Sequence, residues 1–175
     1  MSSRSEEDRI GADRPGELTG LSGALPNGQV VIVASRYNAS ICDPLVDAAK
    51  QTLLEAGFVE ESVVVVRVPG AWELVGVTRQ VLEKQSVVGA VTLGAVIRGD
   101  TTHDEHINRA VSLGLMELGQ QTGKPIGFGL LTCNNLQQAI DRSGGKAGNK
   151  GEESAAAVIE LLRLAAKVDQ RLAVS

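Results

Sequence analysis

Residues 89–108 read GAVTLGAVIRGDTTHDEHIN, an apolar run followed at once by a polar one. The run up to Ile97 is typical of a strand that is covered on both faces. It ends at Arg98 and Gly99, and five polar residues follow: Asp100, Thr101, Thr102, His103 and Asp104. Ligands of open α/β sheets bind beyond the carboxyl ends of the strands. The stretch therefore indicates an anion site with a proton-transfer group. The alternative is a polar loop in which Thr101 or Thr102 caps the next helix.

The same order of apolar strand, polar turn and amphipathic helix recurs along the chain from about residue 28. We expect strands at residues 30–34, 63–68, 87–97 and 124–132. We expect the later helices at about residues 72–84, 103–121, 137–142 and 152–168. Strands that alternate with helices form a parallel sheet with right-handed crossovers. The sequence therefore predicts the α/β class with a four-stranded parallel sheet.

Two further segments of this pattern are the first helix and the stretch between the last two helices. The first helix begins either at Ser40 or with Asp43 as its N-cap before Pro44, and it ends at Gly57. The segment 143–153, SGGKAGNKGEE, is too rich in glycine and lysine for a helix. We expect a kinked loop there, because glycine tolerates positive φ.

Composition narrows the classes of protein that fit. A chain of 175 residues holds one domain, which we place at residues 28–175, after a flexible polar tail at 1–27. A net charge of −4 without a basic block argues against a nucleic-acid partner. No apolar run approaches the ~18 residues of a membrane span, and the N-terminus does not resemble a secretory signal. Cys42 and Cys133 lack CxxC spacing and are expected to be buried thiols, which indicates a protein of the cytoplasm or of an organelle stroma.

The ends of the four predicted strands supply one set of functional side chains. Parallel strands end at the same edge of a sheet, so the residues that follow them should form a common rim. This rim contains two aromatic rings, Tyr37 and Trp72, together with the carboxylate of Glu73 and the imidazole of His103. The nucleotide-binding patterns GxGxxG and GxxxxGK[ST] are absent from the sequence. The rim therefore predicts a pocket for a planar heterocycle with a charged appendage.

Four segments of the chain resemble the motifs of the 6,7-dimethyl-8-ribityllumazine synthase family. They are SRYN (35–38), VPGAWELV (68–75), LGAVIRGDTTHDEHIN (93–108) and AIDRSGGKAGNKGEE (139–153). The resemblance covers about residues 30–164. It implies the penultimate step of riboflavin biosynthesis, in which 5-amino-6-(D-ribitylamino)uracil condenses with 3,4-dihydroxy-2-butanone 4-phosphate. The products would be 6,7-dimethyl-8-ribityllumazine, phosphate and water, formed without a metal or an organic cofactor.

The resemblance also implies a fold and an assembly. The fold would be a flavodoxin-like three-layer sandwich with a four-stranded parallel sheet, assembling as a pentamer with active sites between adjacent subunits. Some members pack pentamers into an icosahedral shell, and the compact GGKAGNKG turn resembles those members. Pro15 and Pro26 argue against the shell, because each would remove a hydrogen-bond donor from an added strand. Riboflavin synthase is a candidate protein partner.

For the pyrimidine substrate, the resemblance assigns roles to residues on three strand ends. The family's stacking aromatic falls on Tyr37, where many members have phenylalanine. The binding segment for the ribitylaminouracil falls on Ala71, Trp72 and Glu73, with Glu73 suited to accept ribityl hydroxyls. The backbone strip that pairs with the uracil edge falls on Ala95, Val96 and Ile97.

For the second substrate and the chemistry, the resemblance assigns five further residues. The backbone N–H of Asp100 and the hydroxyl of Thr101 would bind the phosphate sugar, with Arg142 as the cation. Phe128 would reach the site from a neighbouring subunit. His103 would move protons, which suits imidazole because it titrates near neutral pH.

Several alternatives stay open at this point. His103 and His106 could suggest a metal pair, but no third ligand is placed to complete it, and we interpret His106 as helix surface. Either Lys146 or Lys150 could line the pocket or the subunit seam, while the other is a charge of the loop, and Arg98 could either shape its turn or touch ligand. The rival functions are a flavin- or pteridine-binding carrier without turnover, and a pure shell protein. The set of His103, Arg142 and Glu73 argues against a carrier, which needs neither a phosphate cation nor a proton shuttle.

Overall fold

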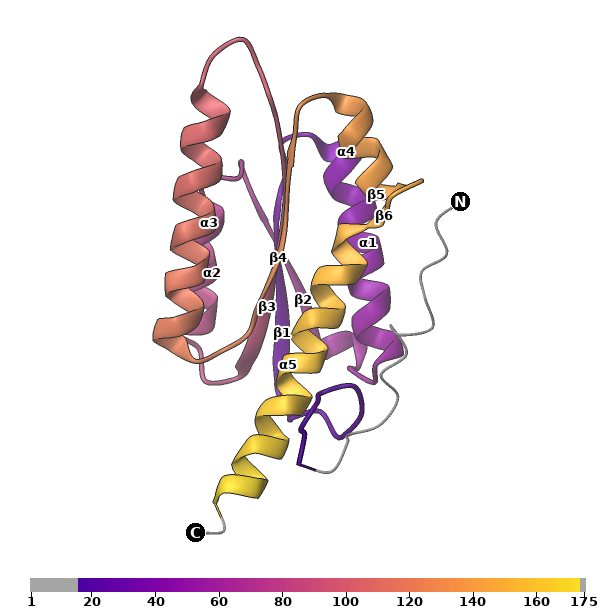
Figure 1. The fold of residues 1–175 in the computed structure, drawn as a ribbon, viewed down its shortest axis with the longest axis vertical. Helices are drawn as coiled ribbons and strands as arrows, with labels where there is room; N and C mark the ends of the chain where they lie inside the picture. Colours follow the sequence, from indigo (N-terminus) through magenta and orange to yellow (C-terminus); the bar gives the residue numbers. More distant parts are fainter. Residues whose placement is uncertain (1–15, 174–175) are drawn as a thin grey trace.

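The computed structural model describes residues 16–173, which fold around one parallel sheet of four strands (Figure 1). The strands are β1 (Gln29–Ser35), β2 (Val63–Val68), β3 (Val87–Ile97) and β4 (Ile126–Cys133). Their order across the sheet is β2-β1-β3-β4, and all three pairings are parallel. The predicted α/β class with a four-stranded parallel sheet is confirmed.

Five helices cover the two faces of this sheet. They are α1 (Ala39–Glu55), α2 (Leu74–Leu82), α3 (His103–Thr122), α4 (Leu136–Arg142) and α5 (Lys150–Leu172). Figure 1 shows α2 and α3 on one side of the sheet and α1, α4 and α5 on the other. Each face has its own apolar core, because alternate residues of a strand point to opposite sides. Val30 and Ile32 lie in one core, and Val31 and Val33 in the other.

The beginning of α1 settles the choice between Ser40 and Asp43. The helix begins at Ala39 with Asn38 as its N-cap residue, so a start capped by Asp43 is wrong. The carbonyl of Asn38 accepts hydrogen bonds from the N–H groups of Ile41 and Cys42, at 2.9 and 3.0 Å. Helical bonding is therefore established before Pro44, which lies inside the helix. The predicted end is confirmed, because Gly57 follows the C-cap residue with a φ of 114°.

The predicted loop at residues 143–153 is shorter than expected. It forms a small antiparallel hairpin of β5 (Ser143–Gly145) and β6 (Gly148–Asn149), and Gly144 and Gly148 have positive φ. Helix α5 then begins at Lys150, inside the segment we expected to be a loop. The side chain of Asn149 accepts hydrogen bonds from the N–H groups of Gly151 and Glu152, which stabilises the helix at this earlier point.

The chain ahead of β1 lies against α5. Gly20 is buried there, and a Cβ at this position would be 1.8 Å from the carbonyl oxygen of Glu160. Most of the predicted flexible tail, with Pro15, lies outside the described residues, and the domain boundary at residue 28 stays a prediction.

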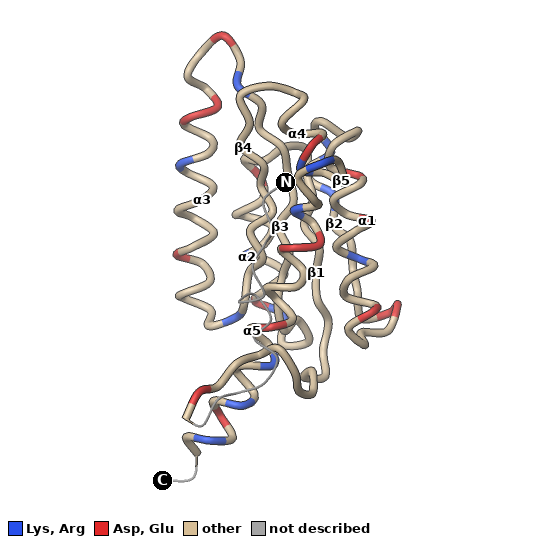
Figure 2. Tube along the Cα trace, turned by 45° about the vertical axis from the view of Figure 1, so that its right-hand side comes forward, with Lys and Arg blue, Asp and Glu red and all other residues tan. Residues whose placement is uncertain are grey.

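No helix within residues 16–173 is long and apolar enough to cross a membrane. Basic and acidic residues are interspersed over the helices (Figure 2).

Close contact between α5 and α1 depends on one small residue. A Cβ on Gly151 would lie 1.9 Å from the carbonyl oxygen of Leu45, so any larger side chain would force the two helices apart. Gly76 in α2 has open space instead, because a Cβ added there would meet no atom within 4 Å. Gly151 and Gly76 therefore differ in the space around them.

We expect Gly151→Ala to lower the thermal unfolding temperature, because overpacking costs typically ~1–3 kcal/mol and exceeds the gain in helix propensity. Gly76→Ala is the matched control and should raise the unfolding temperature, because alanine is favoured over glycine in an exposed helix by about 1 kcal/mol. Circular dichroism melts of both variants and the parent measure this. A Gly151→Ala protein as stable as Gly76→Ala would contradict the close contact.

Candidate functional site

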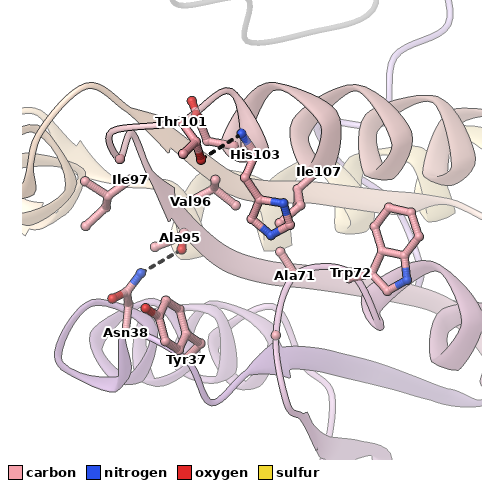
Figure 3. Close-up of a pocket in the computed structure, with 13 residues that line it drawn as sticks. Tyr37, Asn38, Ala71, Trp72, Ala95, Val96, Ile97, Thr101, His103 and Ile107 are labelled. Atoms are coloured by element: carbon pink, nitrogen blue, oxygen red, sulfur yellow. Dashed lines mark hydrogen bonds between the residues drawn. The ribbon is translucent and has the colours of Figure 1, made fainter.

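A cavity of about 420 Å³ lies beyond the carboxyl ends of β1, β2 and β3 (Figure 3). A volume of this size suits a small organic ligand. Eight of the residues predicted from the sequence line it: Tyr37, Ala71, Trp72, Ala95, Val96, Ile97, Thr101 and His103. They come from the end of β3, from the start of α3 and from three separate strand-to-helix connections, which the parallel sheet brings to one edge.

The connection from β1 to α1 presents the ring of Tyr37 to this cavity. The ring is 71% exposed, so packing does not hold it in place. Its backbone is fixed instead, because the N–H of Tyr37 donates to the Pro69 carbonyl at 3.2 Å and to Ser35 Oγ at 3.1 Å. Cys42 Sγ donates to the Tyr37 carbonyl at 3.3 Å. Burial raises the pKa of the Cys42 thiol to about 11, so the thiol keeps the proton that this bond requires.

The connection from β2 to α2 is a tight turn that carries Trp72. The N–H of Leu74 donates to the Ala71 carbonyl at 3.2 Å, and the N–H of Gly70 donates to Glu73 Oε2 at 2.8 Å. The Trp72 ring is 62% exposed and lies beside Ala71 in Figure 3. Glu73 is not among the residues that line the cavity, and one of its carboxylate oxygens already binds its own turn. Helix α2 begins after this turn, two residues later than expected.

The end of β3 forms an open backbone edge in the cavity wall. The last pair between β1 and β3 is Ala34 with Leu93, whereas β3 continues beside β4 until Ile97 pairs with Cys133. Residues 95–97 therefore have a strand on one side only. On the other side, Asn38 Nδ2 donates to the Ala95 carbonyl at 2.9 Å (Figure 3).

His103 is the first residue of α3, and its ring extends from the helix toward Ala71 (Figure 3). Thr102 is the N-cap residue but makes no side-chain capping bond, whereas Thr101 Oγ1 accepts a long hydrogen bond of 3.5 Å from the N–H of His103. His106 is exposed and does not line the cavity. Within residues 16–173, no three His, Cys, Asp or Glu side chains are grouped so that they could hold a metal ion.

Four predicted site residues lie outside the cavity wall of this single chain: Glu73, Asp100, Phe128 and Arg142. Arg142 ends α4 and donates from Nη1 to the Gln138 carbonyl at 3.3 Å. It lies near the end of β4, because its charge opposes the rise in the pKa of Cys133 that burial causes. Phe128 is half-exposed and lines a second, more apolar cavity of about 780 Å³ between α3, β4 and α5.

The charged residues left open by the sequence also lie outside the cavity wall. Lys146 Nζ is 3.3 Å from Asp141 Oδ2, and Lys150 pairs with Glu153. Arg98 is exposed, and its N–H donates to the Cys133 carbonyl at 2.8 Å, which extends the pairing of β3 with β4 by one residue. Arg98 therefore shapes the end of the strand through its backbone.

Five further residues line the cavity without having been assigned a role from the sequence: Asn38, Gly70, Gly99, Asp104 and Ile107. Asp104 occupies the first turn of α3, where an acidic residue usually balances the helix dipole and gives no separate sign of a site. Its Oδ1 atom is buried without a hydrogen-bond partner among the described residues. Asn38 belongs to the quoted SRYN segment, but the direction of its side chain depends on an unusual backbone conformation that no sequence pattern indicated.

Comparison with known proteins shows the family of the chain. Residues 27–166 match the family model described as 6,7-dimethyl-8-ribityllumazine synthase. A protein of that name from Rhodopirellula baltica is 57% identical over 151 residues, which make up 86% of this chain and 97% of that protein. Proteins of the same name from Desulfovibrio desulfuricans and Xanthomonas campestris are 44% and 46% identical, over 78% and 77% of this chain and 87% of each relative. The chain belongs to the 6,7-dimethyl-8-ribityllumazine synthase family.

Proposed function

We propose that the cavity at the carboxyl ends of β1, β2 and β3 is where this chain performs the reaction of its family. That reaction condenses 5-amino-6-(D-ribitylamino)uracil with 3,4-dihydroxy-2-butanone 4-phosphate to give 6,7-dimethyl-8-ribityllumazine, phosphate and water, in riboflavin biosynthesis. One observation carries the placement: an exposed aromatic ring, an open backbone edge and an imidazole meet in one cavity. A carrier would need the ring and the edge but not the imidazole.

The pyrimidine half of the reaction fits the side of the cavity formed by β1 and β3. The Tyr37 ring offers a flat face for stacking on the uracil ring. The end of β3 from Ala95 to Ile97 offers backbone groups that match the donors and acceptors of the uracil edge: the groups of Ile97 point away from β4, and the Ala95 carbonyl keeps a second lone pair beside its bond to Asn38. Beyond them, Trp72 covers the ribityl chain, and the second carboxylate oxygen of Glu73 accepts its hydroxyls.

The phosphate half fits the connection from β3 to α3. The N–H of Asp100 and the hydroxyl of Thr101 lie just ahead of the N-terminus of α3, where free N–H groups favour an anion. Arg142, near the end of the adjacent strand β4, supplies the cation. His103 lies between the two halves and exchanges the protons that imine formation, loss of phosphate and ring closure require.

We also propose that the site is completed by a second copy of the chain in a pentamer. Phe128 is half-exposed on the apolar cavity between α3 and α5, together with the exposed side chains of Met116 and Leu161. Burying an apolar surface of this kind against a neighbour stabilises an assembly. The ring of Phe128 would then close the cavity of the adjacent subunit. Whether pentamers stop there or pack into an icosahedral shell is read from the mass in solution by light scattering.

The cysteines and the product of the reaction suggest a compartment and a partner for this protein. Both cysteines are free and buried, as is usual in a reducing compartment, and we place the protein in the cytoplasm. Riboflavin synthase is the partner we propose, because it is the enzyme that would receive the product.

We expect the purified protein to form lumazine when both substrates are mixed, with an absorbance that rises over time. His103→Ala should lower turnover by ~10²–10⁴-fold, the usual contribution of general acid–base catalysis. Affinity for the pyrimidine, measured by calorimetry, should change little, because stacking and backbone pairing remain.

His106→Ala is the matched control, because His106 is also exposed on α3 but lies outside the cavity wall. It should keep the turnover of the parent. Full turnover in His103→Ala between pH 6 and 8 would exclude the proton-transfer role. Binding of the pyrimidine without any turnover by the parent would favour the carrier.

Arg142→Ala should raise the KM for the phosphate sugar by about 10- to 100-fold, because a guanidinium bound to phosphate contributes roughly 1.5–3 kcal/mol. The KM of Arg142→Lys for the phosphate sugar should lie between those of Arg142→Ala and the parent, since lysine keeps the charge but loses the planar fork. Inorganic phosphate titrated into all three proteins measures the same difference without catalysis. Arg79→Ala, which removes a guanidinium paired with Glu83 on α2, should behave as the parent. Unchanged phosphate affinity in Arg142→Ala would move the anion site to Arg98 or Lys150.

Mixing two inactive variants tests whether Phe128 acts across subunits. Phe128→Ala and His103→Ala should each be weak alone. When the two are refolded together, about a quarter of the sites in random mixed rings should join an intact Phe128 to an intact His103. Activity should therefore rise well above the sum of the separate variants. Simple addition of the two activities would show that Phe128 does not complete a neighbour's site.

A further inference from the structure

Asn38 has the most unusual backbone conformation near the cavity. Within residues 16–173, it is the only residue other than glycine with a positive φ, at φ 57° and ψ 48°. Side chains resist this left-handed conformation, and asparagine resists it less than most. The surrounding structure holds it there, because the Asn38 carbonyl accepts the first hydrogen bonds of α1, from Ile41 and Cys42.

The side chain of Asn38 does not perform the task usual at its position. An asparagine at a helix N-cap normally accepts a hydrogen bond from its own helix, as Asn135 does from Gln138 in α4 and Asn149 does from Gly151 in α5. Asn38 makes no such bond. The left-handed conformation instead turns its amide across the cavity wall, where Nδ2 donates to the Ala95 carbonyl at 2.9 Å.

The bond to Ala95 replaces a missing strand. Pairing between β1 and β3 stops at Ala34 and Leu93, so the Ala95 carbonyl has no ladder partner on the β1 side. The Asn38 amide satisfies this one carbonyl, and the backbone groups of Ile97, the next residue that points to the same side of β3, stay open toward the cavity, whereas those of Val96 point to β4. The edge is therefore held at its first position and free beyond it.

Asn38 also follows directly in the chain after Tyr37, the residue that carries the aromatic ring. Tyr37 precedes Asn38, and its backbone is bound to Ser35, to Cys42 and to the end of β2 at Pro69. Because the Tyr37 ring is 71% exposed, its position depends on this backbone. Asn38 thus links the turn that presents the ring to the strand that presents the backbone edge (Figure 3).

We propose that Asn38 is a positioning residue for the pyrimidine substrate: its amide fixes the distance between the Tyr37 ring and the open edge of β3. This inference rests on the proposed function, in which the pyrimidine stacks on the ring and pairs with the edge. A planar ligand that stacks with its face on the Tyr37 ring and pairs with its edge along β3 requires the ring and the strand to be at a fixed distance from each other. The phosphate half of the site, at the start of α3, does not touch this link.

Two substitutions distinguish the role of the Asn38 side-chain amide from the role of its backbone conformation. Asn38→Gly adopts the left-handed conformation freely but removes the donor. It should raise the KM for the pyrimidine about tenfold, the effect of one lost hydrogen bond, and leave the KM for the phosphate sugar within about twofold. Calorimetric titration of the pyrimidine should show the same loss of affinity without catalysis.

Asn38→Asp keeps the shape of the side chain and tolerates the left-handed backbone conformation, but it turns a hydrogen-bond acceptor toward the Ala95 carbonyl. At pH 8 its pyrimidine KM should exceed that of Asn38→Gly. At pH 5.5 the protonated carboxyl can donate, because a carboxyl facing a carbonyl favours its neutral form. The KM ratio to the parent should therefore fall as the pH falls. Tyr37, Cys42, His103 and Asp104 also face this region in the parent and the variants alike, so each KM is compared with that of the parent at the same pH.

Thermal unfolding of all variants separates positioning from folding. A lower unfolding temperature with equal rises in both KM values, or a pyrimidine KM in Asn38→Gly that matches the parent, would overturn the inference and leave the function in place. A pH-independent ratio in Asn38→Asp would also overturn it. If the parent itself neither binds the pyrimidine nor makes lumazine, the proposed function fails, and this inference fails with it.

Discussion

The unequal length of two neighbouring strands is the constraint on which this site depends. β3 extends beyond its last pair with β1, while β4 supports it on the other side through Ile97. Hydrogen-bonding groups at the end of β3 are thus rigid, because they belong to a sheet, and unpaired on one side, because the next strand has already turned away. A loop of the same sequence would offer the same groups without the rigidity. The ring, the imidazole and the Asn38 amide all surround this one edge.

The close packing of the helices sets the position of the remaining parts. Glycines occur where backbones meet, as at Gly151 against the Leu45 carbonyl and Gly127 against the Ser154 carbonyl. These contacts hold α5 against α1 and β4, and α5 begins directly after the hairpin that follows Arg142. The cation near the end of β4 is therefore attached to the core through a short, well-bonded segment. On the other side of β4, the apolar cavity with Phe128 stays uncovered in the single chain.

Much of the fold could be predicted because its causes are local. Runs of mostly apolar residues define β2 and β3 at the predicted residues, and Gly57 marks the end of α1 through its positive φ. Boundaries were missed where a distant or side-chain contact decided them. The Asn149 side chain starts α5 earlier than its composition suggests, and the backbone of Asn38 starts α1 ahead of Pro44. At these two helix starts, hydrogen bonds that form only in the folded chain outweigh the weak helix and loop preferences of the local sequence.

By itself, the sequence determined the class of fold, the order of its elements and the family, since these follow from periodicity and from motifs in a fixed order. It also predicted that several strand ends share one rim, because parallel strands must end together. Tertiary structure alone decided which groups meet there. Eight predicted residues line the cavity, whereas Glu73 binds its own turn and Phe128 faces the opposite cavity. The direction of a side chain, such as that of Asn38 toward Ala95, depends on backbone angles and on partners 57 residues away, which no local pattern encodes.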